Sequence, residues 1–448
     1  MDDVVKLKQI MLLIGDIVIF YLALTATLFL RYATDRYKHG FEEFFSTHFW
    51  PFTLVLFLWI LIAYIGGLYD LRSLKNNPDF TKKFFALVAI NGALAILLFY
   101  LLPLVITPRT NLFIFLVIFG LSQYIWRGFY NTLLSSGKPI NRILLIGCNQ
   151  AAEALVNHIE KNPQLGYEIK FWMKEGLQDK EFEHLSQIIL ANDVNLIVVP
   201  AHIKKNAKAA KLIYHQLILD IEVLDLAGLY ERIFLKVPIA ELEEVWFLEN
   251  LAKNHSIYDF FKRPMEALIS LLLIILFLPF GIIISLLTAL TSKGPIILRQ
   301  TRVGKAGQIF TLYKFRSMVA NAEKHGPEWS TPQDKRSTPF GSLLRRTHLD
   351  EIPQLINVIK GDLSLIGPRP ERPEFVKNLK QEIAFYELRH LARPGITGWA
   401  QIHYRYGASV EDAYEKLQYE IYYLKNRSLV LDFIIAIKTL RLFFVSLK

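Results

Sequence analysis

The sequence has little cysteine and relatively little charge. Only one of its 448 residues, Cys148, is a cysteine, so no disulfide can form within the chain. The paired Cys and His spacings that are typical of zinc sites are also absent. Charged residues make up 21% and apolar residues 52% of the chain, whereas an average soluble protein has about 25% charged and about 45–50% apolar residues. This balance favours a protein with membrane segments.

The charge that is present is mostly positive. The formal net charge of +10 would suggest a nucleic acid partner in a soluble protein. Here the lysines and arginines lie beside apolar runs, which fits anionic lipid headgroups better. Phosphorylated substrates are a second fit. We therefore expect a lipid bilayer, and no nucleic acid, as the partner. The apolar N-terminal segment lacks a small-residue cleavage site, so we interpret it as a retained anchor.

Four apolar runs fill the first third of the chain, and each approaches the ~20 residues that a membrane-spanning helix needs. They cover about residues 7–30, 49–68, 84–106 and 111–134. The connection after the second run carries Arg72, Lys75, Lys82 and Lys83, whereas the next connection carries only Arg109. The positive-inside rule then places both ends of this bundle, residues 1–138, in the cytoplasm.

One acid, Asp16, lies inside the first run. An acid within a membrane segment is a candidate functional residue. No proton-relay partners recur in the other runs, so we favour an acid that is hydrated near the inner end or paired within the bundle.

A middle domain follows at about 139–255. "NRILLIGCNQAAEALVNHI" predicts a strand, a tight turn and a helix, and "VNLIVVP" and "IEVLDLAGL" predict further buried parallel strands. This pattern is typical of a Rossmann-like α/β domain. The turn keeps Gly147, but Asn149 and Ala152 replace the second and third glycines that let a pyrophosphate approach. We favour a degenerate domain used in packing, dimerisation or regulation over a nucleotide site.

Another apolar run, about 267–290, contains Pro279 near its middle and Gly281 just after it. It is either a fifth spanning helix or a helix that enters the membrane, breaks at Pro279 and returns to the same face. A full crossing would put the basic region after Lys293 outside, away from cytoplasmic nucleotides. We therefore predict a re-entrant helix at about 265–291.

The last region, 256–448, shows no strong β alternation, and we expect it to be mostly helical. The segment "LVLDFIIAIKTLRLFF" is either a membrane-surface helix or a buried core helix. The region also concentrates polar side chains in apolar settings. Adjacent acids, Asp350 and Glu351, stand in "RTHLDEIPQL". Basic residues that suit phosphate lie in "TRVG", "YKFRSM", "GPRP" and "ARPG", namely Arg302, Lys314, Arg316, Arg369 and Arg393. A structural ion pair with Asp334, Asp362 or Glu371 is the alternative for each.

These motifs, in this order, resemble the bacterial sugar transferases, the monotopic polyprenyl-phosphate phosphoglycosyl transferases. The matching stretch runs from "FKRPMEAL" through "GPIILRQTRVGKAGQIFTLYKFRSM", "LDEIPQLINVIKGDLSLIGPRP" and "RPGITGWAQI" to "KLQYEIYYLKNRSLVLD". The four-run bundle and the middle domain are similar to the N-terminal part of the large members of this family.

The resemblance implies a reaction in which a UDP-sugar donates its sugar-1-phosphate to undecaprenyl phosphate and UMP leaves. It implies that Asp350 is the nucleophile, that Mg²⁺ is the cofactor, and that the product starts an exopolysaccharide, capsule or O-antigen. Asp350 and Glu351 are the candidate Mg²⁺ ligands, and Glu351 could instead tune Asp350 or shuttle a proton. Location at the cytoplasmic face of the bacterial inner membrane and a homodimer through the middle domain are further implications. The chemistry agrees, because a dication and arginines relieve the repulsion between a carboxylate and a diphosphate.

Two other functions compete with this expectation. A polytopic transferase that joins both substrates in one step would form no covalent intermediate. A catalytically inactive scaffold of a polysaccharide assembly complex is disfavoured, because the acid pair and its arginines are all present. The identity of the sugar is left open by these motifs.

Overall fold

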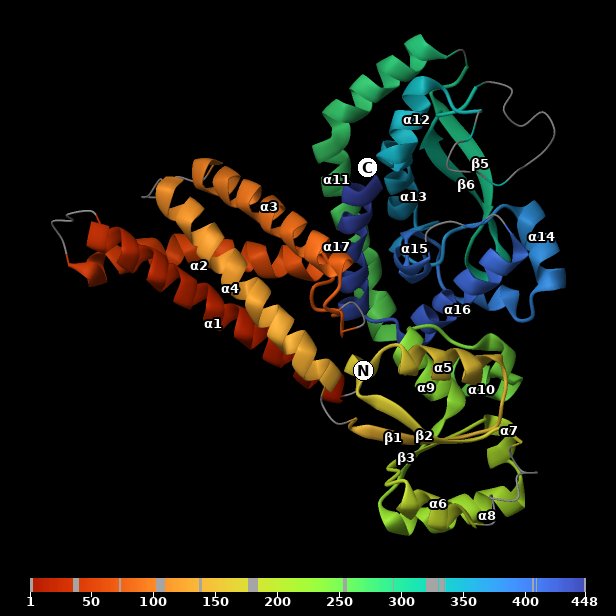
Figure 1. The fold of residues 1–448 in the computed structure, drawn as a ribbon. Coiled ribbons are helices and arrows are strands. Elements are labelled where there is room, and N and C mark those ends of the chain that lie inside the picture. Colours follow the sequence, from red (N-terminus) through yellow and green to blue (C-terminus); the bar gives the residue numbers. More distant parts are fainter. Residues whose placement is uncertain are drawn as a thin grey trace. The chain divides into compact units, whose positions relative to one another are not determined.

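The computed structural model describes two compact units, residues 1–232 and 233–448 (Figure 1). The described residues are 3–34, 40–71, 74–101, 109–136, 139–175, 184–252, 256–292, 294–319, 329, 334, 336–404, 407 and 409–446. Two residues used in the topology predictions, Arg72 and Lys293, lie outside them.

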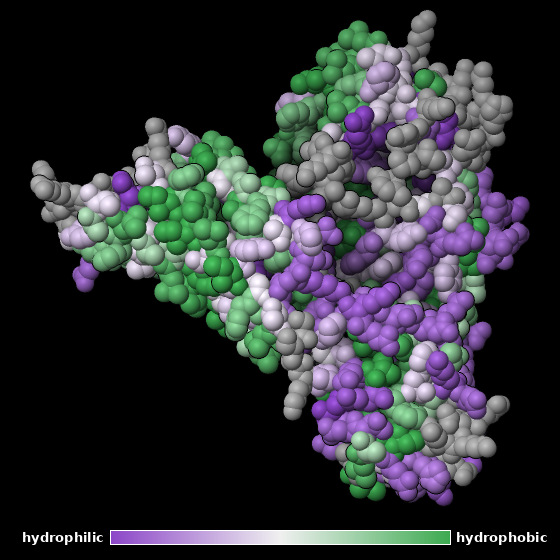
Figure 2. Space-filling view, in the orientation of Figure 1, coloured by the Kyte–Doolittle hydropathy of each residue, from purple (hydrophilic) through white to green (hydrophobic). Residues whose placement is uncertain are grey.

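The first unit begins with four long apolar helices, as predicted. They are α1 (Asp3–Thr34), α2 (Phe41–Ile65), α3 (Pro78–Leu101) and α4 (Arg109–Ser136). Each is long and apolar enough to cross a membrane. Apolar residues cover the surface of these helices in Figure 2, and outward-facing side chains such as Phe57, Phe113 and Ile125 are more than 60% exposed. An apolar exterior of this kind is suited to lipid.

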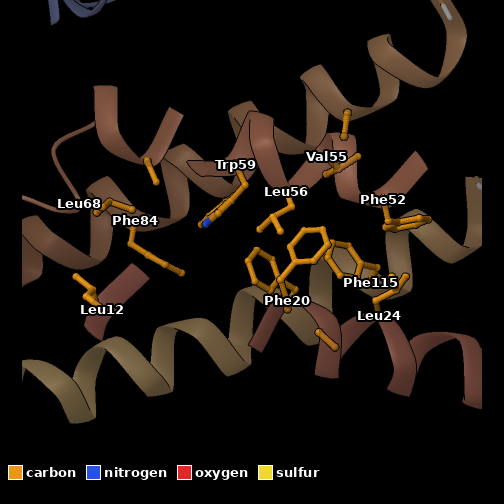
Figure 3. Close-up of a cluster of buried hydrophobic side chains, with 14 of the residues drawn as sticks. Leu12, Phe20, Leu24, Phe52, Val55, Leu56, Trp59, Leu68, Phe84 and Phe115 are labelled. Atoms are coloured by element: carbon orange, nitrogen blue, oxygen red, sulfur yellow. The ribbon is translucent and has the colours of Figure 1, made fainter. Parts of the chain in front are cut away.

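Aromatic side chains fill the interior of the bundle (Figure 3). The ring of Phe20 meets that of Phe115 edge-on at 4.8 Å, and Trp59 meets Phe84 at 6.3 Å. All four side chains are at most 1% exposed. Large, specifically packed rings therefore hold the four helices in one register, since lipid gives no hydrophobic drive for helix association.

Asp16 is paired within the bundle, which confirms one of the two expectations for it. Its carboxylate forms an ion pair with Arg127 of α4 and accepts a 2.7 Å hydrogen bond from the Tyr69 hydroxyl. Arg127 also donates to the Leu68 carbonyl oxygen at 2.6 Å. The pair thus ties α1 and α4 to the turn after α2, and Arg127 is a partner that the sequence pattern did not indicate.

A four-stranded, all-parallel sheet follows the bundle, in the order β2-β1-β3-β4. Its helices alternate with its strands, and the three predicted strands are confirmed as β1, β3 and β4. The bounds are β1 (Asn141–Ile146), α5 (Gln150–Glu160), β2 (Tyr167–Met173), α6 (Leu185–Ala191), β3 (Leu196–Val199), α7 (Ala201–Lys204), α8 (Ala207–Gln216) and β4 (Glu222–Asp225).

The turn after β1 is filled by the chain's own residues. Gly147 has a φ of +86°, and a Cβ there would lie 3.2 Å from Pro200. The Trp172 indole donates to the Gly147 carbonyl oxygen at 2.8 Å, and the Asn149 side chain accepts the Ala152 amide at 2.7 Å. These contacts occupy the edge at which a parallel sheet of this kind would bind a nucleotide.

The second unit starts earlier than the predicted boundary at 255. Leu235, Lys236 and Val237 follow α9 (Leu226–Phe234) and already pack on C-terminal helices. The Trp399 indole donates to the Leu235 carbonyl oxygen at 2.9 Å, and Lys236 pairs with Glu415 at 2.7 Å. We attribute residues 233–252, including α10 (Glu244–Leu251), to this unit because of these contacts.

The predicted break at Pro279 is absent, because α11 is one helix over Ser256–Thr291 with Pro264 and Pro279 inside it. Figure 1 shows α11 curving along its length, as a helix that lacks backbone donors can. Its two ends contact the same unit. Near its start Glu266 bonds to Ser364, and near its end Ile284 packs against Phe315.

The rest of the unit combines short helices with a hairpin that the sequence analysis missed. In chain order the elements are β5 (Ile297–Val303), β6 (Ile309–Phe315), α12 (Pro339–Arg346), η8 (Leu349–Glu351), α13 (Gln354–Lys360), β7 (Ser364–Ile366), α14 (Pro373–Glu382), η9 (Tyr386–Leu391), β8 (Gly395–Thr397), α15 (Trp399–His403), α16 (Val410–Asn426) and α17 (Leu429–Ser446). One side of α17 is buried at Ile435, while Phe433 is 66% exposed. One face of α17 is thus buried, as expected for a core helix, and another is exposed, as expected for a membrane-surface helix.

Candidate active site

The adjacent acids lie on the one-turn helix η8, between α12 and α13. His348 precedes this turn with a left-handed φ of +54°, which reverses the chain after α12, and Pro353 begins α13. Leu349 and Ile352, on either side of the acids, pack against a buried cluster made of Ile284, Phe315 and Leu344. The acids are thus held by a packed turn.

Asp350 is buried without a hydrogen-bond donor among the described residues. Its side chain is 6% exposed, and no described residue donates a hydrogen bond to its carboxylate. Burial, followed by repulsion from Glu351, raises its pKa to about 7, although Lys314 and Arg369 act in the opposite direction. At neutral pH this carboxylate is poorly solvated, only partly ionised and free to react.

Glu351 differs from its neighbour because it has a partner. Burial alone would raise its pKa, but Arg369 outweighs burial and holds the pKa below its usual range. An Arg369 Nη2–Glu351 Oε1 distance of 2.5 Å joins the two groups. The adjacent acids therefore have opposite pKa shifts, which is typical of acids that divide catalytic roles. The Arg369 side chain remains 48% exposed and accessible to a substrate.

The hairpin β5–β6 brings two more cations to the acids. Because side chains alternate along a strand and Arg302 pairs with Phe310 in the register, Arg302 and Lys314 project from the same face. β6 contacts η8. Burial, then the charge of Arg302, lowers the pKa of Lys314 to about 8. No described residue forms a hydrogen bond or ion pair with the Lys314 amine, so its charge is available to a phosphate.

Arg302 is more committed to the protein. It donates to the Pro370 carbonyl oxygen at 3.1 Å and lies 3.9 Å from Glu371. Burial lowers its pKa to about 10. These contacts, which include the ion-pair alternative with Glu371, make Arg302 a support for the loop that carries Arg369.

Two glycine-containing loops place Arg369 and Arg393 on neighbouring backbones. β7 pairs in parallel with β8. A Cβ on Gly367 would lie 2.4 Å from the Arg393 carbonyl oxygen, and one on Gly395 would lie 2.1 Å from the Gly367 nitrogen. Only glycine permits this approach. The half-buried Arg393 side chain has no hydrogen bond or ion pair with any residue that the structure describes.

Arg316, a predicted phosphate contact, is engaged with groups of the chain itself. Its guanidinium donates to Ser292 Oγ at 2.9 Å, to the Ser292 carbonyl oxygen at 2.5 Å and to the Pro295 carbonyl oxygen. These groups lie at the C-terminal end of α11, where helix carbonyls lack partners. All three guanidinium nitrogens are engaged. The geometry supports a structural role for Arg316, and we omit it from the proposed phosphate contacts.

The acid pair provides a limited set of metal ligands. Among the described residues there is no group of three or more His, Cys, Asp and Glu side chains that could hold a metal. Mg²⁺, however, commonly binds one or two carboxylates together with substrate phosphates. The unpaired carboxylate of Asp350 fits this requirement, whereas Glu351 would share its charge with Arg369. Asp362 instead accepts a hydrogen bond from Asn357 at 3.3 Å and anchors a turn.

Three supporting residues were not predicted. Asn357, fully buried on α13, donates to the Thr311 carbonyl oxygen at 2.7 Å and so fixes α13 against β6. Arg389 pairs with Glu420 at 2.7 Å and donates to the Arg369 carbonyl oxygen at 2.8 Å. Asn357 and Glu420 stand in the quoted motifs and Arg389 lies outside them, but only the tertiary structure reveals the role of each.

Comparison with known proteins gives the family. Residues 257–446 match the model of the bacterial sugar transferase family. The chain belongs to this family. The whole candidate site, from Arg302 to Arg393, lies within the matched residues, and the transferase unit of the structure adds residues 233–256 in front of them.

Several named relatives are transferases. A UDP-N-acetylgalactosamine-undecaprenyl-phosphate N-acetylgalactosaminephosphotransferase of Aeromonas hydrophila is 39% identical over 51% of this chain and 58% of its own length. UDP-glucose:undecaprenyl-phosphate glucose-1-phosphate transferases of Klebsiella pneumoniae and Caulobacter vibrioides are 27% and 37% identical. The Klebsiella match covers 93% of this chain and 91% of that protein, and the Caulobacter match 40% and 68%. The match thus spans less than two thirds of the Aeromonas protein.

Proposed function

We propose that this transferase moves sugar-1-phosphate from a UDP-sugar to undecaprenyl phosphate and releases UMP. The observation that carries the proposal is the buried, unpaired Asp350 carboxylate near the cations of Lys314 and Arg369. The relatives named above use UDP-N-acetylgalactosamine or UDP-glucose, so the class of donor is proposed and the sugar is not.

The proposed reaction has two displacements at one phosphorus. An Asp350 oxygen attacks the phosphorus that bears the sugar, the bond from this phosphorus to the bridging oxygen breaks, and UMP leaves with that oxygen. A phosphate oxygen of undecaprenyl phosphate then attacks the same phosphorus, and the Asp350 carboxylate leaves. A carboxylate suits both steps because it is a nucleophile and also a good leaving group.

The first step brings a negatively charged carboxylate to a diphosphate. The basic residues would relieve the repulsion between these charges. Lys314 and Arg393 have no protein partner among the described residues, and Arg369 is half exposed beside Glu351. We propose that these three contact the diphosphate. Mg²⁺, held by Asp350 with a smaller contribution from Glu351, would supply further neutralisation of phosphate charge.

We propose that α11 is re-entrant although its helix is unbroken. Both its ends pack on the transferase unit, while long apolar side chains such as Leu272, Leu276 and Leu286 are about 58–64% exposed. A helix of 36 residues that crossed the membrane would have to separate its two ends by the full bilayer. A curved helix that embeds one face keeps the unit on the cytoplasmic side of the inner membrane, where UDP-sugars are found.

We also propose that the parallel-sheet domain is a Rossmann-like domain without a nucleotide. The support is that Asn149 and Ala152 replace two glycines of the nucleotide-binding turn and that Pro200 and Trp172 lie close to the backbone of Gly147. The homodimer through this domain stays a prediction, which native mass spectrometry of the protein in nanodiscs would test.

The nucleophile is tested with Asp350→Asn and, as a matched control, the exposed Asp259→Asn. Each full-length protein in nanodiscs is mixed with Mg²⁺ and a panel of UDP-sugars in the absence of the lipid acceptor. Wild type and the control should release about one UMP per enzyme and gain the mass of a phosphosugar, whereas Asp350→Asn should do neither. Near-normal UMP release by Asp350→Asn would refute the assignment, and release that requires the lipid would favour a one-step reaction.

Topology needs a separate experiment. In a Cys148→Ser background, Gln308→Cys at the hairpin tip and Gly40→Cys before α2 receive a membrane-impermeant thiol reagent in intact spheroplasts. We expect labelling at residue 40 alone, and at both residues after permeabilisation. Labelling at residue 308 in intact spheroplasts would contradict a re-entrant α11.

A further inference from the structure

Three charged side chains lie buried at the start of α11, away from the acid pair. Lys262, Glu266 and Asp432 are each 5–8% exposed. Lys262 and Glu266 are one helical turn apart on α11, and Asp432 comes from α17. Buried ions are expensive to maintain, and the proposed chemistry uses none of the three. Their contacts therefore need another explanation.

Glu266 accepts hydrogen bonds from backbone amides, as a neighbouring strand would. Its carboxylate accepts the Ser364 hydroxyl at 2.7 Å and the backbone amides of Leu365 and Ile366 at 3.2 and 3.4 Å. These groups belong to β7, which has β8 as its strand partner. Without Glu266, the amides of Leu365 and Ile366 would lose this acceptor inside the protein, which is unfavourable.

Lys262, one helical turn before Glu266, binds the same strand. We call Lys262 and Glu266 together the clamp. The Lys262 ammonium group donates to the Ile366 carbonyl oxygen at 2.8 Å and to the Tyr423 hydroxyl at 2.9 Å. The charge is balanced by Asp432 at 2.9 Å, with Glu266 farther away at 3.6 Å. Lys262 and Glu266 thus bind a backbone acceptor and two backbone donors of the same short strand.

The clamped strand leads directly to the site. Ile366 is followed by Gly367, whose backbone lies against the Arg393 carbonyl oxygen, then by Pro368 and Arg369. Because only Gly367 and Pro368 separate Ile366 from Arg369, the backbone between them has little conformational freedom. The turn that carries the acid pair is linked to the same helix, because Leu349 and Ile352 pack against a buried cluster to which Ile284 of α11 contributes, together with Phe315 and Leu344. Helix α11 therefore contacts the strand that leads to Arg369 near its start and contributes to the packing under the acids near its end.

We propose that Lys262 and Glu266 are positioning residues that set the distance between Arg369 and the acid pair. They act through the backbone of β7 and do not touch substrate. The inference rests on the proposed function only where it concerns turnover. The clamp itself is a set of contacts that can be measured without any reaction.

The first measurement is hydrogen exchange of the full-length protein in nanodiscs. Glu266→Ala should speed exchange of the Leu365 and Ile366 amides at least tenfold and leave the amides of α13 unchanged. Glu266→Gln keeps an acceptor oxygen and should restore most of the protection. The exposed Glu387→Gln is the matched control and should leave exchange as in wild type. Unchanged exchange at residues 365 and 366 in both Glu266 variants would overturn the clamp.

The second measurement is turnover of the same proteins with the best UDP-sugar donor. Because misplacement of about 1 Å can reduce a rate about 100-fold, Glu266→Ala and Lys262→Met should lower kcat about 10- to 100-fold and change the donor KM less than threefold. Glu266→Gln should stay within about fivefold of wild type. A Gln variant as inactive as the Ala variant, or full activity with an exchanging strand, would overturn the positioning role. If wild type used no donor, the proposed function would fail while the exchange result stood.

Discussion

Replacing Asp350 with asparagine should abolish turnover and yet stabilise the protein. Asp350 is 6% exposed, accepts no hydrogen bond from the described residues and has a pKa raised to about 7 from an ordinary value of 3.8. Asparagine has nearly the same shape and no charge. The substitution therefore removes a buried charge while it leaves the packing of η8 in place.

The magnitude follows from the pKa shift. Below about pH 3.8 the carboxyl is protonated in both the folded and the unfolded protein. Between pH 3.8 and about 7 the unfolded chain ionises first, so stability falls as the pH rises, and above pH 7 the loss is complete. A rise in pKa from 3.8 to about 7 corresponds to about 4 kcal/mol at pH 8, and less than half of this loss has accumulated by pH 5.

Thermal unfolding of the protein in nanodiscs, followed by tryptophan fluorescence, measures this effect. One kcal/mol shifts Tm by about 2–4 °C for a unit of roughly 200 residues. Asp350→Asn should therefore raise Tm by about 8–16 °C at pH 8 and by about 3–6 °C at pH 5. Asp259→Asn, at an exposed site on α11, should not change Tm by more than about 1 °C at either pH.

The dependence on pH is the decisive part. A gain in Tm that is equal at pH 5 and pH 8 would show that the asparagine improves packing and that Asp350 does not titrate as inferred. A loss of Tm at pH 8 would show that the carboxylate is stabilised in the folded protein, and the reasoning from burial would be refuted.

Three further predictions concern the neighbouring residues. The pH profile of kcat/KM should be bell-shaped, with limbs near pH 7 from Asp350 and near pH 8 from Lys314; Lys314→Met should remove the alkaline limb and move the acid limb to higher pH. Gly367→Ala puts a Cβ 2.4 Å from a carbonyl oxygen and should cost about 1–3 kcal/mol in thermal unfolding, whereas Gly281→Ala, where nothing lies within 4 Å, should cost none. Arg316→Met should lower Tm, because the carbonyls of Ser292 and Pro295 lose their donor, but should leave the donor KM within twofold; a large rise in KM would restore Arg316 as a phosphate contact.

The long elements were predictable because long apolar segments are a strong signal in the sequence. Four apolar runs became α1 to α4, and three apolar segments became strands of the parallel sheet. The hairpin β5–β6 was missed because its inner face carries Gln300, Arg302 and Lys314, so apolar alternation is broken where the strands face the site. β7 and β8 have three residues each, which is too short for any period.

The candidate site was predictable only as a set of residues, and their roles needed the fold. Adjacent acids and arginines in rigid loops pointed to phosphate chemistry. Two arginines in similar motifs have different partners, because Arg369 pairs with Glu351 whereas Arg316 donates to the hydroxyl and the carbonyl oxygen of Ser292, just after α11. Nothing local separates them. The unpaired state of Asp350 was equally invisible in the sequence, since it results from what the folded chain does not place beside it.

Two buried acids of this unit, Asp350 and Glu266, differ in the hydrogen bonds that they receive. Glu266 and Asp350 are equally buried, but Glu266 receives a hydroxyl and two amides whereas Asp350 receives none. Burial raises the pKa of both carboxyls, but the partners of Glu266 hold its oxygens on β7, whereas no described residue donates to the oxygens of Asp350. A carboxylate without partners at position 266 would leave β7 unsupported. The hydrogen bonds of Glu266 therefore hold β7 in place, whereas the lack of such hydrogen bonds leaves the Asp350 carboxylate available to a substrate.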